Sequence, residues 1–460
     1  MLSMGVFVSC SDEFLNPEPT DAVLEEEVFE SYKVAEAAMV GAYDQLSAPT
    51  FEGHYVPMMS DIMGEDVLIN SVNNWGWFVE VYQMNVMPNY SYVASPWSMG
   101  YKVIYDANRI VAEAQNIPGA SQEEMNKLEG QAKVLRAFSM LKLVEMYAPA
   151  YMANPDAPGI MNVNKPVNAY SEDFGRAPIR EVYGQIVSDL VSAIDMLDDM
   201  SFKGIFDKRA AQAVLARTYL DMQDWEKSRD MAKAAYEGME LMTIDEMLEG
   251  FYASNRETIF TVAYTAEDNN TYLSIPSFYW PVSGYSSMRA DSKFVDSFSN
   301  NDYRKYQFLK QDDIDEDNYL ILKFKHNQQV GNAERISIRA SEMYLIEAEC
   351  EAELGNTSAA QDALYIVQSR ANPGVTKSTA TGQALIDEVL MERRKELFGE
   401  GFRWNDIKRR NLPFKREGDH WVNFDFGSDD ADYYRLTFPI PQSEIDRNSK
   451  FSQEDQNMGY

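Results

Sequence analysis

One stretch near the end of the chain constrains the fold most, because it places charges of both signs on a segment that must be buried. It is the run ERRKELFGEGFRWNDIKRR over residues 392–410. The helix leading into it has apolar side chains three and four residues apart, which predicts one buried face. Gly399 and Gly401 can adopt positive φ and end that helix. The apolar positions are Leu385, Ile386, Val389, Leu390 and Leu397, and then Phe402, Trp404 and Ile407 beyond the glycines.

The charged residues between these apolar anchors include Arg393, Arg394, Glu396, Arg403 and Asp406. Charges that are removed from water must be paired, because an isolated buried ion is very costly. We therefore predict a structural ion-pair cluster that closes the fold. A charged catalytic cluster is the alternative interpretation of the same residues.

The stretch also resembles a known family. Its pattern ER-x-x-EL-x-x-EG-x-R-x-x-D-[IL] is similar to the signature of the SusD/RagB family, surface lipoproteins of Bacteroidetes-type bacteria that capture nutrients, mostly glycans, for an outer-membrane transporter. Similar motifs occur along the chain in the family's order: CSDEFLNPEPT from Cys10, LRAFSMLKLVEMYAP from Leu135, IP-x-x-EI from Ile440 and the terminal QN-x-GY. The resemblance covers essentially the whole chain.

The N-terminal residues are typical of a lipoprotein. Residues 1–9, MLSMGVFVS, form a short apolar run that ends in a small residue directly before Cys10, as at the end of a bacterial lipoprotein signal. We interpret residues 1–9 as a partial signal peptide, Cys10 as the acylated residue, and residues 10–24 as an extended tether kept open by Pro17 and Pro19. An ordinary disordered start is the alternative.

Hydrophobic periodicity predicts helices over residues 25–46, 97–116, about 122–147 and 179–198, the third opened by a capping box of Ser121 and Glu124. Two later stretches, from Leu215 and from Glu347, each predict two helices that cross at small residues, which is the logic of tetratricopeptide repeats. The fold class we predict is mainly α, with tetratricopeptide-like helix pairs in an α-α superhelix, long irregular loop insertions and little β.

We expect a single domain over residues 25–460, with helical repeats over about 25–237 and 338–410. A loop-rich insertion is expected over about 239–335, and an irregular C-terminal segment over 411–460. Within the insertion, residues 258–263 (TIFTVA) predict a strand.

Charge and motif content exclude several classes. The chain has 73 acidic and 41 basic residues, a net charge of −32, which argues against binding to nucleic acid or to an anionic membrane surface. His54, His326 and His420 are isolated, no CxxC occurs, and the acidic run over residues 312–317 lacks the glycine and the final glutamate of an EF-hand. We predict no metal, no cofactor and no catalytic residue. Cys350 is expected to be a small buried side chain.

Two aromatic loops are the candidate binding residues. A sugar binds by stacking its C–H face on an aromatic ring while amides and charged groups bond its hydroxyls, and both residue types occur together here. The alternative is that these rings fill the core. The first loop supplies Asn73, Asn74, Trp75, Trp77, Phe78 and Tyr82; the second supplies Tyr279, Trp280, Tyr285 and Arg289. The family resemblance implies ligand contacts in these two regions.

The resulting hypothesis is a non-catalytic, lipid-anchored protein of the outer membrane, facing the exterior. It would bind a nutrient oligo- or polysaccharide and deliver it to a SusC-like TonB-dependent transporter, a partner implied by the resemblance alone. Three alternatives remain open: capture of a peptide by the same fold, an α-helical glycosidase, and a repeat scaffold for protein assembly.

Overall fold

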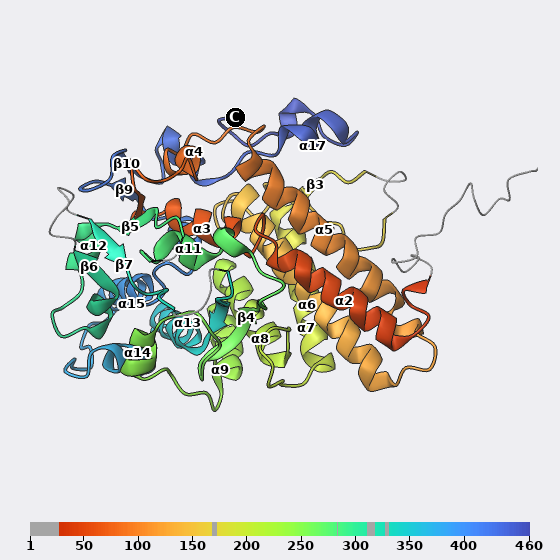
Figure 1. Cartoon of the computed structure of the whole chain (residues 1–460), viewed down its shortest axis with the longest axis horizontal. Helices are drawn as coiled ribbons and strands as arrows, with labels where there is room; N and C mark the ends of the chain where they lie inside the picture. The colour runs from red at the N-terminus through yellow and green to blue at the C-terminus, as the bar shows by residue number, and fades with distance from the viewer. Residues whose placement is uncertain (1–26, 168–172, 283, 311–317, 327–330) are drawn as a thin grey trace, which may run out of the picture.

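The computed structural model describes residues 27–167, 173–282, 284–310, 318–326 and 331–460 (Figure 1). It is mainly helical with little strand, as predicted. Cys10, the tether and the acidic run over residues 312–317 lie outside the described residues. Within these ranges, no helix is both long enough and apolar enough to cross a bilayer.

The longer helices form a superhelix in which each packs on its neighbours along the chain. They are α2 (Tyr32–Ser47), α5 (Ser91–Glu113), α6 (Gln122–Tyr147), α7 (Ile179–Met196), α8 (Lys208–Asp221), α9 (Trp225–Tyr236), α13 (Ala340–Glu353), α14 (Thr357–Ala371) and α15 (Gln383–Glu396). The pairs α8–α9 and α13–α14 are the two repeats predicted from the sequence. This arrangement confirms the predicted fold class.

Local sequence signals explain where the helices begin. The Ser121–Glu124 capping box opens α6 as predicted, and Pro178 precedes α7. In the α8–α9 pair, the small Ser228 lets the helices approach closely enough for its hydroxyl to donate to the Ala216 carbonyl at 2.8 Å. Two boundaries were wrong: α2 begins at Tyr32, after a turn, and α5 begins at Ser91, six residues before the predicted start.

The insertion leaves the superhelix uninterrupted. The chain leaves α9 at Tyr236 and re-enters at Ala340, yet α9 and α13 pack directly on each other. The insertion is closed at its base by the antiparallel pair β4–β8. Its elements are α10 (Ile244–Glu249), β4 (Thr258–Val262), η3 (Thr271–Leu273), α11 (Ile275–Tyr279), β5 (Met288–Ala290), α12 (Ser292–Asp296), η4 (Tyr303–Gln307), β6 (Phe308–Lys310), β7 (Tyr319–Ile321) and β8 (Arg335–Arg339).

The predicted strand over 258–263 is confirmed as β4, but the insertion contains more strand than expected. Strands β5, β7 and β6 continue an antiparallel sheet from β1 (Val67–Ile69), with Leu68 opposite Arg289. Figure 1 shows the sheet and α12 at one end of the molecule. Three-residue strands are too short to show alternation in the sequence. Smaller elements complete the fold: α3 (Tyr55–Ile62), α4 (Val79–Tyr82), η2 (Ala114–Asn116), β2 (Pro158–Met161), β3 (Arg176–Pro178), α16 (Arg403–Arg409), β9 (Phe414–Arg416), β10 (Phe424–Phe426), η5 (Ala431–Leu436), α17 (Gln442–Arg447) and η6 (Gln453–Asp455).

The charged stretch over residues 392–410 forms a buried ion-pair network, as predicted. Glu396 accepts from Arg339 at 2.7 Å, from Arg304 at 2.8 Å and from Arg370. Arg393 pairs with Asp406 at 2.9 Å. Burial alone would raise the pKa of Glu396, but Arg370, Arg339 and Arg304 hold it well below its usual range.

The network reaches the superhelix and the small sheet as well. Glu349 on α13 accepts from Arg409 at 2.6 Å, and Arg394 pairs with Asp66 beside β1. Gly399 and Gly401 have φ of +76° and +87°, and a Cβ on Gly401 would lie 2.8 Å from the Pro57 Cα. The charges satisfy one another away from solvent, which supports the structural interpretation over the catalytic one.

Candidate functional site

The loop between β1 and α4 is shaped by side-chain amides. The Asn70 carboxamide oxygen accepts from the backbone N–H of Val72 at 2.9 Å and of Asn73 at 3.0 Å. Asn74 donates to the Asn70 carbonyl at 2.9 Å and accepts from the Gly76 N–H at 2.7 Å. These bonds hold Trp75 with its backbone in the left-handed region, at φ +58°, an uncommon conformation for a bulky residue. The side chain of Trp75 is 72% exposed.

A second loop, between α11 and β5, is held equally closely. The Ser286 N–H donates to the Ser277 carbonyl at 2.8 Å, and the Tyr285 N–H donates to the Ser277 hydroxyl at 3.3 Å. Gly284 has φ of +82°, and a Cβ there would lie only 2.0 Å from the Ser277 Oγ. Only glycine fits this turn, which fixes the position of the following Tyr285.

The β1–β5 pair brings the two loops together, because each loop adjoins one of these strands. The Asn70 N–H donates to the Ser287 carbonyl at 2.8 Å. Tyr285 then meets Trp75 with ring centroids 6.4 Å apart, Trp77 at 5.8 Å and Tyr272 at 6.2 Å. We call these four rings (Trp75, Trp77, Tyr272 and Tyr285) the aromatic platform.

The platform is partly open to solvent. Trp75 and Tyr272, at 57%, are exposed, and Trp77 and Tyr285 are half-buried. Figure 1 shows α3 and α11 next to each other, with α4 above them towards the top edge. Helix α3 contacts α4, and α11 contacts both η3 and β5. Tyr272 was missed by sequence reasoning. In the sequence Tyr272 lies six residues before Phe278, at a point that shows no clear periodicity. Its place in η3 is known only from the structure.

Beneath the platform lies a buried aromatic layer. Phe278 contacts Trp77 at 5.6 Å and Tyr285 at 5.0 Å, and His54 lies 4.4 Å below Phe278. Burial lowers the pKa of His54 to about 3, so its ring is neutral at ordinary pH. Among the described residues, neither nitrogen of His54 has a hydrogen-bond partner. The layer gives the platform a rigid base.

Four of the predicted binding residues are buried. Phe78, Tyr82 and Tyr279 have no exposed surface, and Arg289 is 8% exposed. The Tyr82 hydroxyl bonds His420 Nδ1 at 2.7 Å, and the Tyr279 hydroxyl donates to Asp61 at 3.0 Å. A ring enclosed on every side offers no face to a ligand. For these rings the alternative interpretation, that they fill the core, describes their place in the structure.

The remaining predicted residues border the platform. Asn73 is exposed next to Trp75, while the carboxamide of Asn74 is used within the loop. Trp280, directly after α11, is half-buried. Of the predicted set, the structure therefore brings Trp75, Trp77 and Tyr285 into one exposed cluster.

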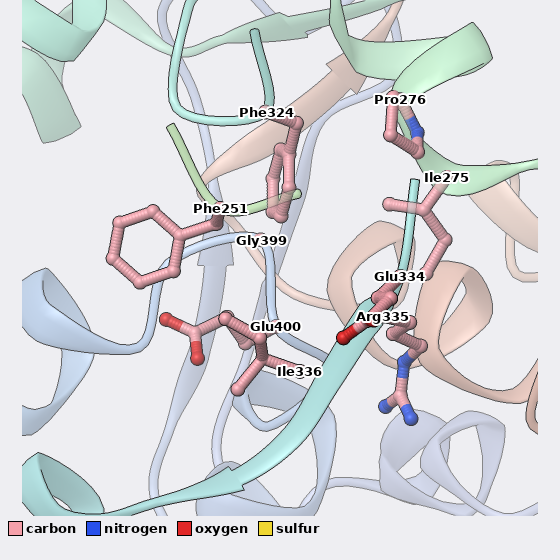
Figure 2. A pocket seen from close by; sticks show the side chains of 9 residues that line it. All are labelled: Phe251, Ile275, Pro276, Phe324, Glu334, Arg335, Ile336, Gly399 and Glu400. Carbon is pink, nitrogen blue, oxygen red and sulfur yellow. The ribbon is translucent and has the colours of Figure 1, made fainter. Parts of the chain in front are cut away.

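Two pockets are alternative candidates for the binding site. The pocket in Figure 2, between Phe251, Phe324 and Gly399, holds about 10 Å³, roughly room for one water, whereas small-molecule sites have about 300–1,000 Å³. A wider hollow of about 270 Å³ lies between α12, α15 and β9. Its charges are already paired, Lys293 with Glu417 at 2.6 Å and Arg394 with Asp66. Neither presents stacked rings.

Metal binding and thiol chemistry find no support in the part of the chain that is described. There, no group of three or more His, Cys, Asp or Glu side chains is placed to hold a metal ion. Cys350 is buried, and burial raises its pKa to about 12, which keeps it an inert thiol.

Comparison with known proteins identifies the family. The family model described as "SusD family" matches residues 318–460, and a second, "Starch-binding associating with outer membrane", matches residues 13–220. The chain belongs to the SusD/RagB family. The two matches include the charged stretch over residues 392–410 and the first aromatic loop.

Individual relatives of this SusD/RagB protein are distant but span its length. SusD-like protein P2 of Formosa agariphila is 24% identical, with 98% of this chain and 97% of the relative covered. A SusD superfamily structure from Bacteroides vulgatus has a TM-score of 0.85 at 23% identity, covering 94% of this chain and 100% of that one. A "laminarin binding SusD-like protein" has a TM-score of 0.75 at 20% identity, covering 94% and 100%. The solved structures establish the fold.

Proposed function

We propose that this protein binds a nutrient glycan on its aromatic platform and delivers it, chemically unchanged, to a SusC-like TonB-dependent transporter of the outer membrane. The observation that carries the proposal is the exposed Trp75, held in a left-handed backbone conformation next to Tyr285 and Tyr272. Exposed rings in a braced loop are an energetic cost to a free protein. A sugar stacked on them would recover that cost.

The platform suits a sugar better than it suits most small ligands. It is an open surface of flat rings bordered by the exposed Asn73, not an enclosed apolar pocket. An open surface can hold one segment of a long polysaccharide whose ends extend into solvent. The name of the laminarin-binding structural neighbour supports a polysaccharide as ligand.

Membrane attachment belongs to the same proposal. The family description "associating with outer membrane" supports the location, and Cys10, as the acylated residue, would supply a lipid anchor. Delivery to a transporter rests on membership in the family. Peptide capture, glycosidase activity and a scaffolding role remain the alternatives, because exposed rings can also bind a peptide.

The experiment uses the full chain carrying Cys10→Ser, which prevents acylation. Calorimetric titration against a panel of polysaccharides and peptides would give the ligand class, and reducing ends would be measured in the same samples. We expect saturable glycan binding without new reducing ends. Trp75→Ala should weaken that binding by about 1–3 kcal/mol, as for other aromatic hot spots.

The matched control is Tyr306→Ala, since Tyr306 is also an exposed ring, at 66%, but lies on η4 away from the platform. It should leave affinity unchanged. Release of reducing ends would establish an enzyme, binding of peptides alone would favour the alternative ligand, and equal affinity for the Trp75→Ala variant would remove the platform from the binding site.

A further inference from the structure

The two segments that form the platform contain no basic residue. From Val34 to Tyr101 the sequence has no Lys or Arg, and from Glu257 to Met288 it again has none, although 41 of the 460 residues in the chain are basic. The first segment includes β1, its aromatic loop and α4; the second includes η3, α11 and the loop to Tyr285. Trp75, Trp77, Tyr272 and Tyr285 are therefore presented by chain without positive charge.

Cations from neighbouring elements are already engaged. Arg289, the first basic residue after the second segment, is 8% exposed and donates to the carbonyls of Ser286 and Met288, both at 2.8 Å. Arg335 on β8 pairs with the buried Glu52 at 2.7 Å. Lys203, whose carbonyl bonds the Thr261 N–H, pairs with Asp207 at 3.2 Å.

Acidic residues, in contrast, lie close to the platform along the chain. Glu267 and Asp268 are exposed in the loop that leads into Tyr272. That loop is braced: the Thr265 N–H donates to the Asp268 carbonyl at 2.8 Å, and Asn269 donates to the Thr265 carbonyl at 2.9 Å. Even with Arg289 counted, the local charge is negative, as is the net charge of −32 of the whole chain.

This charge distribution decides between classes of glycan. Proteins recognise carboxylate, sulfate and phosphate groups mainly with Arg and Lys, which bond them with charge-assisted hydrogen bonds. A polyanion on this platform would find no such donor on either of the two segments, and the exposed carboxylates of Glu267 and Asp268 in the loop before Tyr272 would disfavour it at low salt. An uncharged sugar needs only ring faces and neutral polar groups.

We infer that the platform selects uncharged glycans and excludes polyuronic and sulfated ones. The inference rests on the proposed function, since it concerns the ligand class of the same site. It follows from the charge around Trp75 and Tyr272 and does not depend on which neutral sugar or linkage is bound.

The test uses matched pairs of probes. Each neutral glucan of a panel, such as laminarin or amylose, would be compared with a C6-oxidised derivative of the same length, in which the hydroxymethyl groups have become carboxylates. Affinities for the full Cys10→Ser chain would be measured at about 20 mM and 200 mM salt. We expect the affinity for the neutral glucan to depend little on salt. The oxidised glucan should bind at least tenfold more weakly at low salt, and this difference in affinity should be smaller at high salt.

A charge-reversal variant tests the cause. Glu267→Lys with Asp268→Lys should raise affinity for the oxidised glucan several-fold at low salt while leaving the neutral affinity unchanged. The control places two lysines outside the two platform segments, by Glu226→Lys with Asp230→Lys, both exposed on α9, which lies near the lower edge of Figure 1. It should have no such effect.

The outcomes separate the two claims. Oxidised glucan binding as tightly as its neutral parent at low salt would overturn the charge selection and leave glycan capture standing. An equal gain in both lysine variants would also overturn it, because the effect would then come from net charge and not from the platform. If neither member of any pair binds, the proposed function itself fails, and the inference with it.

Discussion

The ion-pair network buries charged side chains, whereas the aromatic platform exposes apolar rings to solvent. In the network, charges such as Glu396 and Arg339 are almost fully buried and bond one another. In the platform, Trp75 and Tyr272 are exposed and held by a backbone that is itself well bonded. The ion pairs of the network join distant segments of the fold. The platform leaves its rings exposed, as the proposed binding surface requires.

The largest effect is expected from removing the centre of the network. Glu396→Ala would leave Arg304, Arg339 and Arg370 with fewer acidic partners in a buried setting. Breaking a buried ion pair costs about 3–5 kcal/mol, so the free energy of unfolding in denaturant should fall by about that amount. If the protein stays folded at the working temperature, glycan affinity should be unchanged. A loss below about 1 kcal/mol would show that the network is not a structural centre.

A second prediction compares two rings from the same stretch of sequence. Tyr82 is fully buried and bonds His420, so Tyr82→Ala should lower the free energy of unfolding by about 3 kcal/mol. Trp75→Ala should change it by no more than about 0.5 kcal/mol, because that ring is exposed. Chemical denaturation of both variants would check this. Similar losses in the two would remove the distinction between core and platform.

The buried His54 beneath the platform should make the stability of the protein depend on pH. Its folded pKa, about 3, lies below the ordinary value of 6.5, so the unfolded chain takes up a proton first as the pH falls. Stability is therefore present above pH 6.5 and declines towards pH 3, by about 1.4 kcal/mol for each unit well below 6.5. Between pH 7 and 5, His54→Leu should lose about 1–2 kcal/mol less stability than the parent. If the free energy of unfolding of the parent and of the His54→Leu variant changed equally with pH, the burial of a neutral imidazole would be contradicted.

The smallest effect is expected at an exposed ion pair. On the surface, Lys377 Nζ lies 2.5 Å from Asp362 Oδ1, and the two side chains are 38% and 65% exposed. Asp362→Asn should change the free energy of unfolding by less than about 0.5 kcal/mol, because water solvates both charges. The same measurement on Glu396→Ala then shows how much of the larger effect comes from burial. A loss as large as that of Glu396→Ala would end the comparison.

The sequence predicted the helices and the network because their signals are local. The α6 capping box and the spacing of apolar residues lie within one helix, and charges among buried anchors such as Trp404 require partners wherever they lie. The partners themselves were not predictable. Arg304, for example, reaches Glu396 from η4, across many intervening residues.

The site was only half predictable for a related reason. Composition identified the two aromatic loops, but Tyr82 is buried against His420 in the C-terminal segment, and Trp75 meets Tyr285 because β1 pairs with β5. That pairing joins segments more than two hundred residues apart through three-residue strands, which leave no pattern in the sequence. Tyr272 was missed because its exposure depends on the same tertiary arrangement.

The direct packing of α9 on α13 has a consequence for how such a protein can diversify. The superhelix is continuous on either side of the insertion, and β4 and β8 close the insertion at its base. Loops between these strands that do not contribute to the ion-pair network, as Arg304 does, can therefore change in length and composition without repacking the helices. Variation there would alter Tyr272 and Tyr285 but leave the frame intact. The architecture thus allows the aromatic surface to vary while the helical scaffold is kept.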